Sequence, residues 1–167
     1  LSELAALLET VASVQAKWTS GLGDGSDGGP ELEYAARPYP SGGAAYELEL
    51  YLTVADCEGL ERGFYHYDAD QHVLTPIPVR MQEIDAQLAA AEFAMGTTGR
   101  PQILMTIAAR FGRVAWKYSS VAYSLILKDV GVLLQALYLM ATDMNLGGCA
   151  IGTNNIELFA KMTGLDF

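Results

Sequence analysis

The feature that most restricts the fold is a long apolar segment in the second half of the chain, SLILKDVGVLLQALYLMATD. Over residues 130–141 only Gln135 is polar, whereas Lys128 stands before this run and Asp143 after it. The uninterrupted stretch is therefore shorter than the ~20 apolar residues that cross a bilayer. The pattern predicts a long helix from about Tyr118 to Asp143, buried in a soluble protein rather than in a membrane.

One narrow stripe of this helix is polar or lacks a side chain. Its members are spaced four, three and four residues apart, which places them on one helical face: Ser124, Lys128, Gly131 and Gln135. A glycine inside a helix costs ~1 kcal/mol relative to alanine and often marks the close approach of another group. Two interpretations remain open: Gly131 admits a neighbouring helix, or the stripe faces a flat or bulky ligand.

The composition indicates one globular domain over residues 1–167. A hydrophobic content of 51% and a mean hydropathy of +0.19 are enough for a substantial core. The 20 acidic residues outnumber the 10 basic ones and give a net charge of -10. Because phosphate neutralisation needs clustered Lys and Arg, we expect no nucleic-acid partner.

Cysteine and histidine spacing argues against a disulfide framework and against a metal site. Cys57 and Cys149 are far apart, and both histidines, His66 and His72, lie in a different segment from Cys149. We expect Cys149 to be a small buried residue and the histidines to belong to a hairpin. The chain begins with leucine and shows no signal-peptide pattern. We therefore expect a trimmed or excised cytoplasmic domain.

The remaining segments predict an α+β domain, with helices packed on a mostly antiparallel sheet. Apolar spacing predicts an N-terminal helix in residues 1–18, with Ser2 as its N-cap, followed by a Gly- and Asp-rich mobile loop at 19–30. Before the long helix we expect a strand at 46–55, a hairpin at 63–77, a helix at 81–93, a central strand at 102–110 and a turn at 111–118. After it we expect a strand at 147–152 and a helix from about Asn155.

Two short glycine segments would expose bare backbone to a ligand. Ser41, Gly42 and Gly43 precede the first long strand, and Gly147 with Gly148 open the strand expected after the long helix. The first segment lacks the terminal Gly-Lys-Ser/Thr of a phosphate-binding P-loop. No GxGxxG connects a strand to a helix, so the chain shows no Rossmann dinucleotide site.

Taken together, four stretches resemble the nitroreductase superfamily, and within it the azoline dehydrogenases that oxidise thiazoline or oxazoline rings in peptide natural products. The stretches are RPYPSGGAAYELELYLTV, GFYHYDADQHVLTPI, WKYSSVAYSLILKDVGVLLQALYLMATDMNLGGCAIG and TGLDF. Their order and spacing carry the resemblance over most of the chain. The family's Arg-Ser-rich N-terminal segment and a further C-terminal segment would lie outside residues 1–167, which implies truncation at both ends.

The resemblance implies FMN in a pocket at a homodimer interface. The flavin ring would lie against the PSGG loop and the LGG backbone, and the long central helix would form much of the subunit interface. A partner subunit would then cover the apolar helix while its polar stripe faces the flavin. The implied cofactor-binding residues are Arg37, Ser41, Gly42, Gly43, Ser124, Lys128, Gly131, Gln135, Gly147 and Gly148, with Arg37 and Lys128 as candidates for the phosphate.

The Lys-Tyr pair of the azoline dehydrogenases maps onto Lys117 and Tyr118. Aromatising an azoline removes a proton from the α-carbon and a hydride equivalent from the adjacent ring carbon, and FMN accepts the hydride. We assign Tyr118 as the base and Lys117 as its electrostatic partner, with the reverse assignment open. Oxygen would recycle the reduced flavin, and the azoline would be carried by a peptide or a carrier, in a multidomain synthetase or a modification complex.

Other interpretations remain open at this point. The chain could be a nitroreductase or quinone reductase that uses NAD(P)H, or a non-catalytic nitroreductase-like domain of a larger biosynthetic assembly. Lys117 could be a surface residue and Tyr118 a packing residue at the start of a helix.

Overall fold

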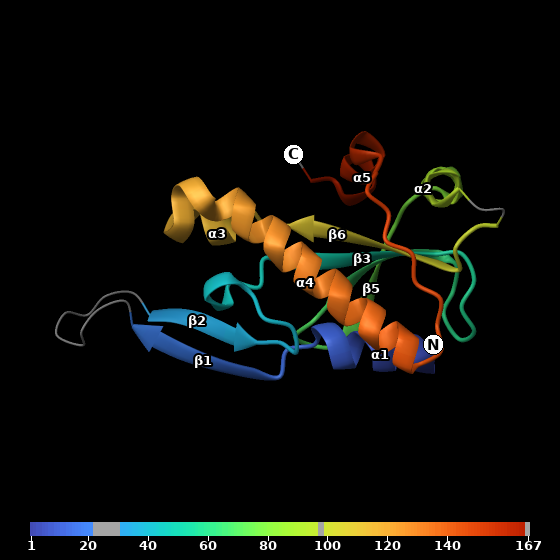
Figure 1. The fold of residues 1–167 in the computed structure, drawn as a ribbon. Helices are drawn as coiled ribbons and strands as arrows, with labels where there is room; N and C mark the ends of the chain where they lie inside the picture. Colours follow the sequence, from blue (N-terminus) through green and yellow to red (C-terminus); the bar gives the residue numbers. More distant parts are fainter. Residues whose placement is uncertain (22–30, 97–98, 166–167) are drawn as a thin grey trace.

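The computed structural model describes residues 1–21, 31–96 and 99–165, and within them two antiparallel sheets. Figure 1 shows the larger sheet at the centre and the smaller one as a hairpin that extends to one side. The larger sheet has the order β5-β4-β3-β6, formed by β3 (Leu48–Val54), β4 (Gly63–Asp68), β5 (Val73–Ile77) and β6 (Ile103–Ala109). The hairpin pairs β1 (Ala16–Gly21) with β2 (Glu31–Ala36).

Helices cover both faces of the four-stranded sheet (Figure 1). On one face, α1 (Ser2–Ala12) and α4 (Ala122–Asp143) contact each other, and α4 contacts β3. On the other face, α2 (Met81–Met95) and α5 (Ile156–Thr163) contact each other. The remaining helical elements are α3 (Gly112–Tyr118) and two single turns, η1 (Gly42–Ala44) and η2 (Ser119–Val121).

The alternation of β3 explains why the sheet is covered on both sides. Leu50 and Leu52 belong to the core cluster that includes α1 and α4, whereas Tyr51 packs with Phe159 of α5. Successive side chains of a strand point to opposite faces, so the period-2 pattern supplies apolar groups to both layers. The predicted α+β class and the antiparallel sheet are confirmed.

The long helix α4 buries one face and exposes apolar side chains on the other. Its buried residues lie at helical spacing: Ala122, Ile126, Asp129, Leu133 and Ala141. Leu127 is 55% exposed and Leu139 is 65% exposed. By length and composition alone, the helical segment Gly112–Asp143 contains a stretch apolar enough to cross a membrane. The predicted long helix is confirmed with a start at Ala122, but its predicted burial is not met within this chain, which covers only one side of it.

The N-terminal prediction was wrong in its extent. Helix α1 ends at Ala12, where the Ser13 hydroxyl donates to the Glu9 carbonyl, and Ser2 lies inside the helix without capping it. Strand β1 occupies the residues that follow, including 19–21 of the predicted mobile loop. Cross-strand pairing overrode the glycine-rich composition there, with the rings of Trp18 and Tyr34 stacked 5.9 Å apart. Residues 22–30 of that loop lie outside the described residues.

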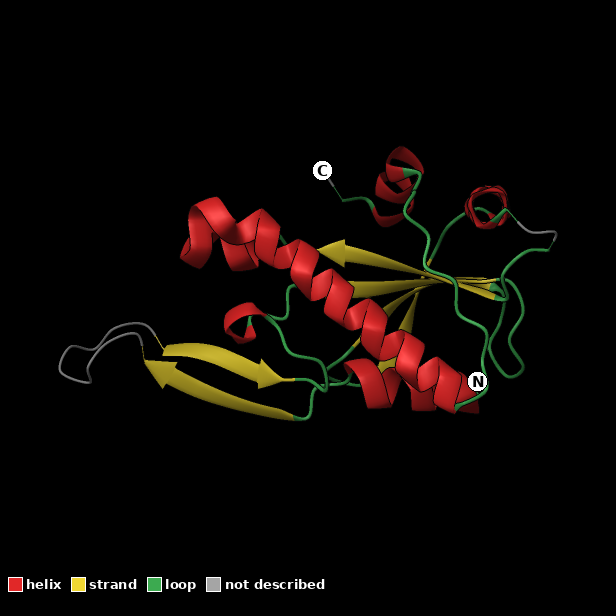
Figure 2. Cartoon of the chain, in the orientation of Figure 1, coloured by secondary structure: helices red, strands yellow, loops and turns green. Residues whose placement is uncertain are grey.

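Three later predictions also need correction. Residues 147–152 form no strand, and Figure 2 shows them as part of the loop that connects α4 to α5. The apolar run expected as a central strand is β6, which pairs only with β3 at the sheet edge among the described strands. The turn expected at 111–118 is mostly the helix α3. Cys149 is exposed rather than buried.

The hairpin, the α2 helix and the last helix are confirmed. Strands β4 and β5 pair around a turn at Ala69–His72. Helix α2 buries the predicted residues Ile84, Leu88 and Ala91. Asn155 caps α5 through its side-chain oxygen, which accepts a hydrogen bond of 3.0 Å from the Leu158 N–H.

Candidate functional site

The turn at residues 41–43 is fastened to the middle of α4 by one buried carboxylate. The Ser41 hydroxyl donates to Oδ2 of Asp129 over 2.9 Å, and the Gly42 N–H donates to the same oxygen over 2.8 Å. A third bond, from the Tyr46 N–H to the Ser41 Oγ over 3.0 Å, closes the turn. The predicted glycine loop is therefore held at a fixed position on the helix, and its Gly42 N–H is already used inside the chain.

Tyr118 lies directly against Gly43. Gly43 has a φ of +63°, in the left-handed region that favours glycine. A Cβ added there would collide with the Tyr118 hydroxyl oxygen and would lie 3.1 Å from its Cζ. Tyr118 ends α3 and is half-buried, and Ser119 follows it with a φ of +32° at the bend before α4. Only a glycine at position 43 leaves room for this tyrosine.

Lys117 places a cation beside that ring. Its Nζ lies 5.4 Å from the centroid of the Tyr118 ring, and the side chain is exposed to solvent. No carboxylate in the described part of the chain forms an ion pair with it. The structure thus brings together Lys117, Tyr118 and the 41–43 turn, although they are about 75 residues apart in the sequence.

The polar stripe of α4 faces away from the core of its own chain. All four residues are exposed: Ser124, Lys128, Gly131 and Gln135. Apart from the adjoining turns of α4, no atom of the described residues lies within 4 Å of a Cβ added to Gly131, so no other described helix uses the space that the glycine provides. The stripe is therefore open to a group from outside the chain.

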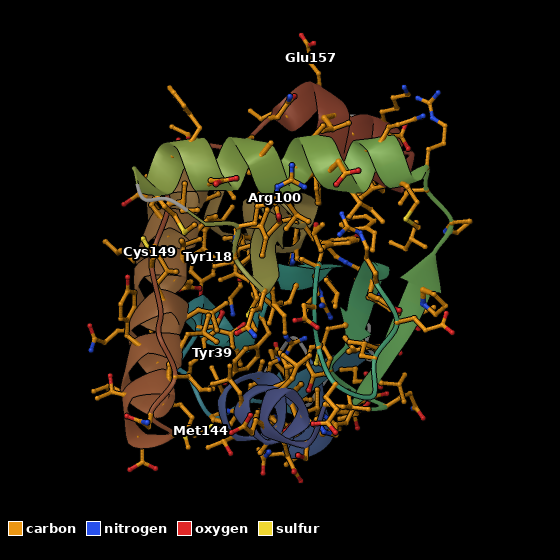
Figure 3. All side chains as sticks on the ribbon, turned by 90° about the vertical axis from the view of Figure 1, so that its right-hand side faces the viewer. Tyr39, Arg100, Tyr118, Met144, Cys149 and Glu157 are labelled. Carbon is orange, nitrogen blue, oxygen red and sulfur yellow. The ribbon has the colours of Figure 1, made fainter. Side chains whose placement is uncertain are left out.

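The second glycine segment lies elsewhere along α4. Gly148 is near Tyr138, whose ring carbon Cε1 would be 3.8 Å from an added Cβ, and the Ala150 N–H donates to the Tyr138 hydroxyl over 2.6 Å. Figure 3 shows Cys149 on the segment that returns beside the helix after Met144. Nine residues of α4 separate Asp129 from Tyr138, a rise of ~13 Å. The two glycine segments of one chain therefore mark two separate places.

Arg37 is placed apart from the α4 stripe. Its guanidinium carbon lies 5.5 Å from the Tyr46 ring centroid, and Nη1 donates a long 3.4 Å bond to the Leu48 carbonyl. Its Nε is buried with no hydrogen-bond partner. Of the two candidates for a phosphate, Arg37 is thus near the 41–43 turn and Lys128 is on the outer face of α4.

Sequence reasoning missed a buried pair of carboxyl groups beneath the turn. Glu47 is fully buried, and its Oε2 lies 3.3 Å from the Ser41 Oγ that also bonds Asp129. Burial raises the pKa of Glu47, and the nearby negative charge of Asp129 raises it further. Helical spacing could have indicated that Asp129 is buried, because it shares the buried face of α4 with Ile126 and Leu133.

Replacing Glu47 with glutamine is expected to change how stability depends on pH. The pKa of Glu47 is higher in the folded state, so its favourable contribution is complete at acid pH and is lost as the pH rises above 4.5 through the raised value. Glu47→Gln removes this loss, and the variant should gain stability relative to the parent between pH 4 and pH 8. Urea unfolding across that range measures the difference; parallel curves for the two proteins would contradict it.

Comparison with known proteins identifies the class to which this fold belongs. A solved nitroreductase-type structure from Anabaena variabilis matches 99% of this chain and 32% of its own chain, with a TM-score of 0.77 and 24% identity. The Escherichia coli microcin synthetase McbBCD complex matches with a TM-score of 0.71 and 24% identity, over 99% of this chain and 57% of that chain. These likenesses define a nitroreductase-like fold.

The sequence comparison identifies the family. The profile of the nitroreductase family matches residues 3–166, so the chain belongs to that family. MJ1384 of Methanocaldococcus jannaschii, whose name assigns it to the nitroreductases, is 32% identical over 120 residues, which are 72% of this chain and 60% of that protein.

Two further relatives are named for peptide processing. The trifolitoxin-processing protein TfxB of Rhizobium leguminosarum bv. trifolii is 28% identical over 138 residues, covering 81% of this chain and 32% of that protein. The microcin B17-processing protein McbC of Escherichia coli is 27% identical over 142 residues, covering 82% and 52%. The chain thus spans between about a third and three fifths of the lengths of these relatives.

Proposed function

We propose that the chain is the FMN-dependent oxidoreductase domain of a system that oxidises thiazoline or oxazoline rings in a peptide natural product. The observation that carries the proposal is Tyr118, held against Gly43 of the 41–43 turn with the Lys117 ammonium beside its ring. Two relatives named for the processing of peptides, TfxB and McbC, support a peptide substrate. The substrate class and the location in the cytoplasm are part of the proposal.

The residues present fit a flavin. The exposed α4 stripe offers a hydroxyl, a bare helical backbone and an amide, and space is open at Gly131. The residues proposed to hold FMN are Arg37, Ser41, Gly42, Gly43, Ser124, Lys128, Gly131, Gln135, Gly147 and Gly148. The Ser41 hydroxyl and the Gly42 N–H already donate to Asp129. These two residues would therefore help FMN binding by fixing the position of the turn. When bound, FMN would accept the hydride equivalent from the azoline ring.

The chain's own contribution is proton transfer and positioning. Tyr118 would take the proton from the α-carbon of the azoline, and the Lys117 ammonium would favour the negative charge that develops on the phenol oxygen. Because Gly43 has no Cβ, the Tyr118 ring can lie directly against the 41–43 turn. A general base placed in this way typically contributes ~10²–10⁴-fold to the rate.

A second copy of the chain would complete the site. In one chain the glycine pair at 147–148 and the 41–43 turn lie at different positions along α4, and the apolar face between them is exposed. An apolar groove of about 370 Å³, lined by residues of α1 and α4 that include Leu139 and Met140, adjoins this face. A face of this kind needs a cover, and we propose that the α4 helices of two copies provide it.

Charges placed on that face should separate the two copies. We expect Leu127→Glu and Leu139→Glu each to convert a dimer into a monomer at micromolar concentration, because a buried unpaired carboxylate is costly. Phe93→Glu is the matched control, since Phe93 is 89% exposed on α2, away from α4. Analytical ultracentrifugation measures the result; a parent chain that sediments as a monomer would exclude the proposed dimer.

The central test combines a spectrum with an assay of turnover. The purified chain should show flavin absorption, release FMN on denaturation, and oxidise a thiazoline-containing peptide with consumption of oxygen. Rapid reduction of the flavin by NAD(P)H without peptide oxidation would instead indicate a nitroreductase or quinone reductase. A chain that takes up no FMN would indicate a non-catalytic domain.

A further inference from the structure

Two arginines of this acidic chain have no carboxylate partner among the residues that the structure describes. The other four arginines all form ion pairs: Arg62 and Arg100 with Asp85, Arg80 with Glu83, and Arg110 with Glu49. Arg37 and Arg113 instead donate to the backbone carbonyls of Leu48 and Tyr46, each through Nη1 at 3.4 Å. The Arg37 guanidinium also lies against the Tyr46 ring, and Arg113 is exposed to solvent. With 20 acidic side chains against 10 basic ones, unpaired arginines are unexpected.

Both unpaired arginines line the same hollow, which has a volume of about 210 Å³. Ala44 and Ala45 also line it, so the hollow begins directly after the Gly43 backbone that contacts Tyr118. Arg113 and Lys117 are four residues apart on α3 and therefore share a helical face. The hollow is thus next to the proposed reaction site rather than on a remote surface.

The acidic groups of the hollow are already bonded. Glu49 accepts Arg110 at 2.7 Å and His66 at 2.9 Å through its two oxygens, and Lys17 lies 2.6 Å from Asp70 and 3.8 Å from Glu33. Asp68 accepts the N–H groups of the two residues at 70–71. None of these carboxylates forms an ion pair with Arg37 or Arg113, although four acidic and four basic side chains line the hollow and balance its formal charge.

Arg37 has hydrogen-bonding capacity to spare. Its Nε is buried without a hydrogen-bond partner, and the bond from its Nη1 to the Leu48 carbonyl is 3.4 Å long. A guanidinium presents five donors in a fork that matches the two oxygens of a carboxylate or phosphate. The Tyr46 ring lies against the guanidinium and limits its orientation. A buried donor without a partner is rare in proteins and is commonly satisfied by water or by a bound group.

We propose that this hollow is an oxyanion subsite in which Arg37 and Arg113 bind one carboxylate or phosphate group. Two sources share this chemistry: a carboxylate of the peptide substrate, and the phosphate of the flavin. The assignment of the carrier rests on the proposed function, whereas binding of an oxyanion by the hollow does not. A substrate carboxylate bound here would fix the register of the peptide relative to Tyr118.

The first experiment needs neither flavin nor turnover. The thermal unfolding temperature is measured with increasing acetate or inorganic phosphate, against sodium chloride at matched ionic strength. A ligand that binds only the folded chain raises this temperature, because at a free concentration L it stabilises that chain by RT ln(1 + L/Kd). Arg37→Gln and Arg113→Gln should each need at least ~10-fold more oxyanion for the same rise, since each removes charge-assisted hydrogen bonds.

The matched control is Arg62→Gln. Arg62 is an exposed arginine directly before β4 that does not line the hollow. Its partner Asp85 also pairs with Arg100 at 2.9 Å, so the carboxylate keeps a cation in this variant. This variant should retain the parental response. The proposal is overturned if the parent gains nothing over chloride, or if Arg62→Gln loses the response as fully as the two hollow variants.

The second experiment distinguishes the two sources. If the oxyanion is a substrate carboxylate, Arg113→Gln keeps its FMN and raises KM for a carboxylate-bearing thiazoline peptide at least ~10-fold, but not for the same peptide with amides in place of the carboxylates. If it is the flavin phosphate, FMN per chain falls and riboflavin binding is unchanged. Equal KM values for both peptides with full FMN content would exclude both sources, even where the chain turns over its substrate.

Discussion

Tyr118→Phe is expected to lower turnover of a thiazoline-containing peptide by at least ~10²-fold per bound flavin, the lower end of a general-base contribution. The variant should fold normally, because the Tyr118 hydroxyl forms no hydrogen bond with any residue that the structure describes, and the ring is retained. FMN content and the association state should match those of the parent. Lys117→Ala should show a loss of turnover in the same direction, since it removes the cation 5.4 Å from the ring.

Tyr65→Phe is the matched control for the loss of a phenol hydroxyl. The Tyr65 hydroxyl donates to the Glu61 carbonyl over 2.7 Å, at a place that does not contact the 41–43 turn. Its removal should lower the free energy of unfolding by about 1 kcal/mol and leave turnover per flavin unchanged. If Tyr118→Phe behaves like Tyr65→Phe, Tyr118 is a packing residue and the proposed base is wrong.

The parts of the fold that the sequence predicted are those with a strong period. The alternation around Leu50 and Leu52, the two-stranded run of 63–77 and the apolar 130–141 stretch each bury a regular set of side chains. In such segments the pattern and the tertiary packing favour the same structure. The grouping of Ser41, Gly43, Lys117 and Tyr118 was predicted only through the family resemblance, because no local signal joins residues so far apart.

The errors fall where tertiary partners decide the structure. Strand β1 forms because it pairs with β2, and its own residues carry little β-propensity beyond Trp18 and Thr19. The sequence pattern of residues 147–152 predicted a strand, but the Ala150 N–H donates to the Tyr138 hydroxyl rather than to a neighbouring strand. Glu47 lies directly before β3, in a segment whose polar residues were expected to face solvent, and only the structure shows that it is fully buried next to Asp129.

Gly43→Ala is expected to lower turnover per flavin as strongly as the loss of the Tyr118 hydroxyl. A side chain at a φ of +63° costs ~1 kcal/mol by itself. The new methyl group would also collide with the phenol oxygen, so Tyr118 must leave its position. Turnover per flavin should fall by ~10²-fold, since a misplaced base loses its contribution. Gly112→Ala is the control, because beyond its own helical turn no atom of the described residues lies within 4 Å of its added Cβ, and its φ is not positive.

A double-mutant cycle separates the steric effect from the backbone effect. In a Tyr118→Phe background the colliding oxygen is gone, and the nearest recorded atom to the methyl group is Cζ at 3.1 Å. Gly43→Ala should therefore cost less stability in that background than in the parent, by ~0.5–3 kcal/mol, the usual range of coupling between residues in contact. Equal costs in the two backgrounds, measured by urea unfolding, would mean that Tyr118 does not lie against Gly43. The turn would then have no direct part in placing the proposed base.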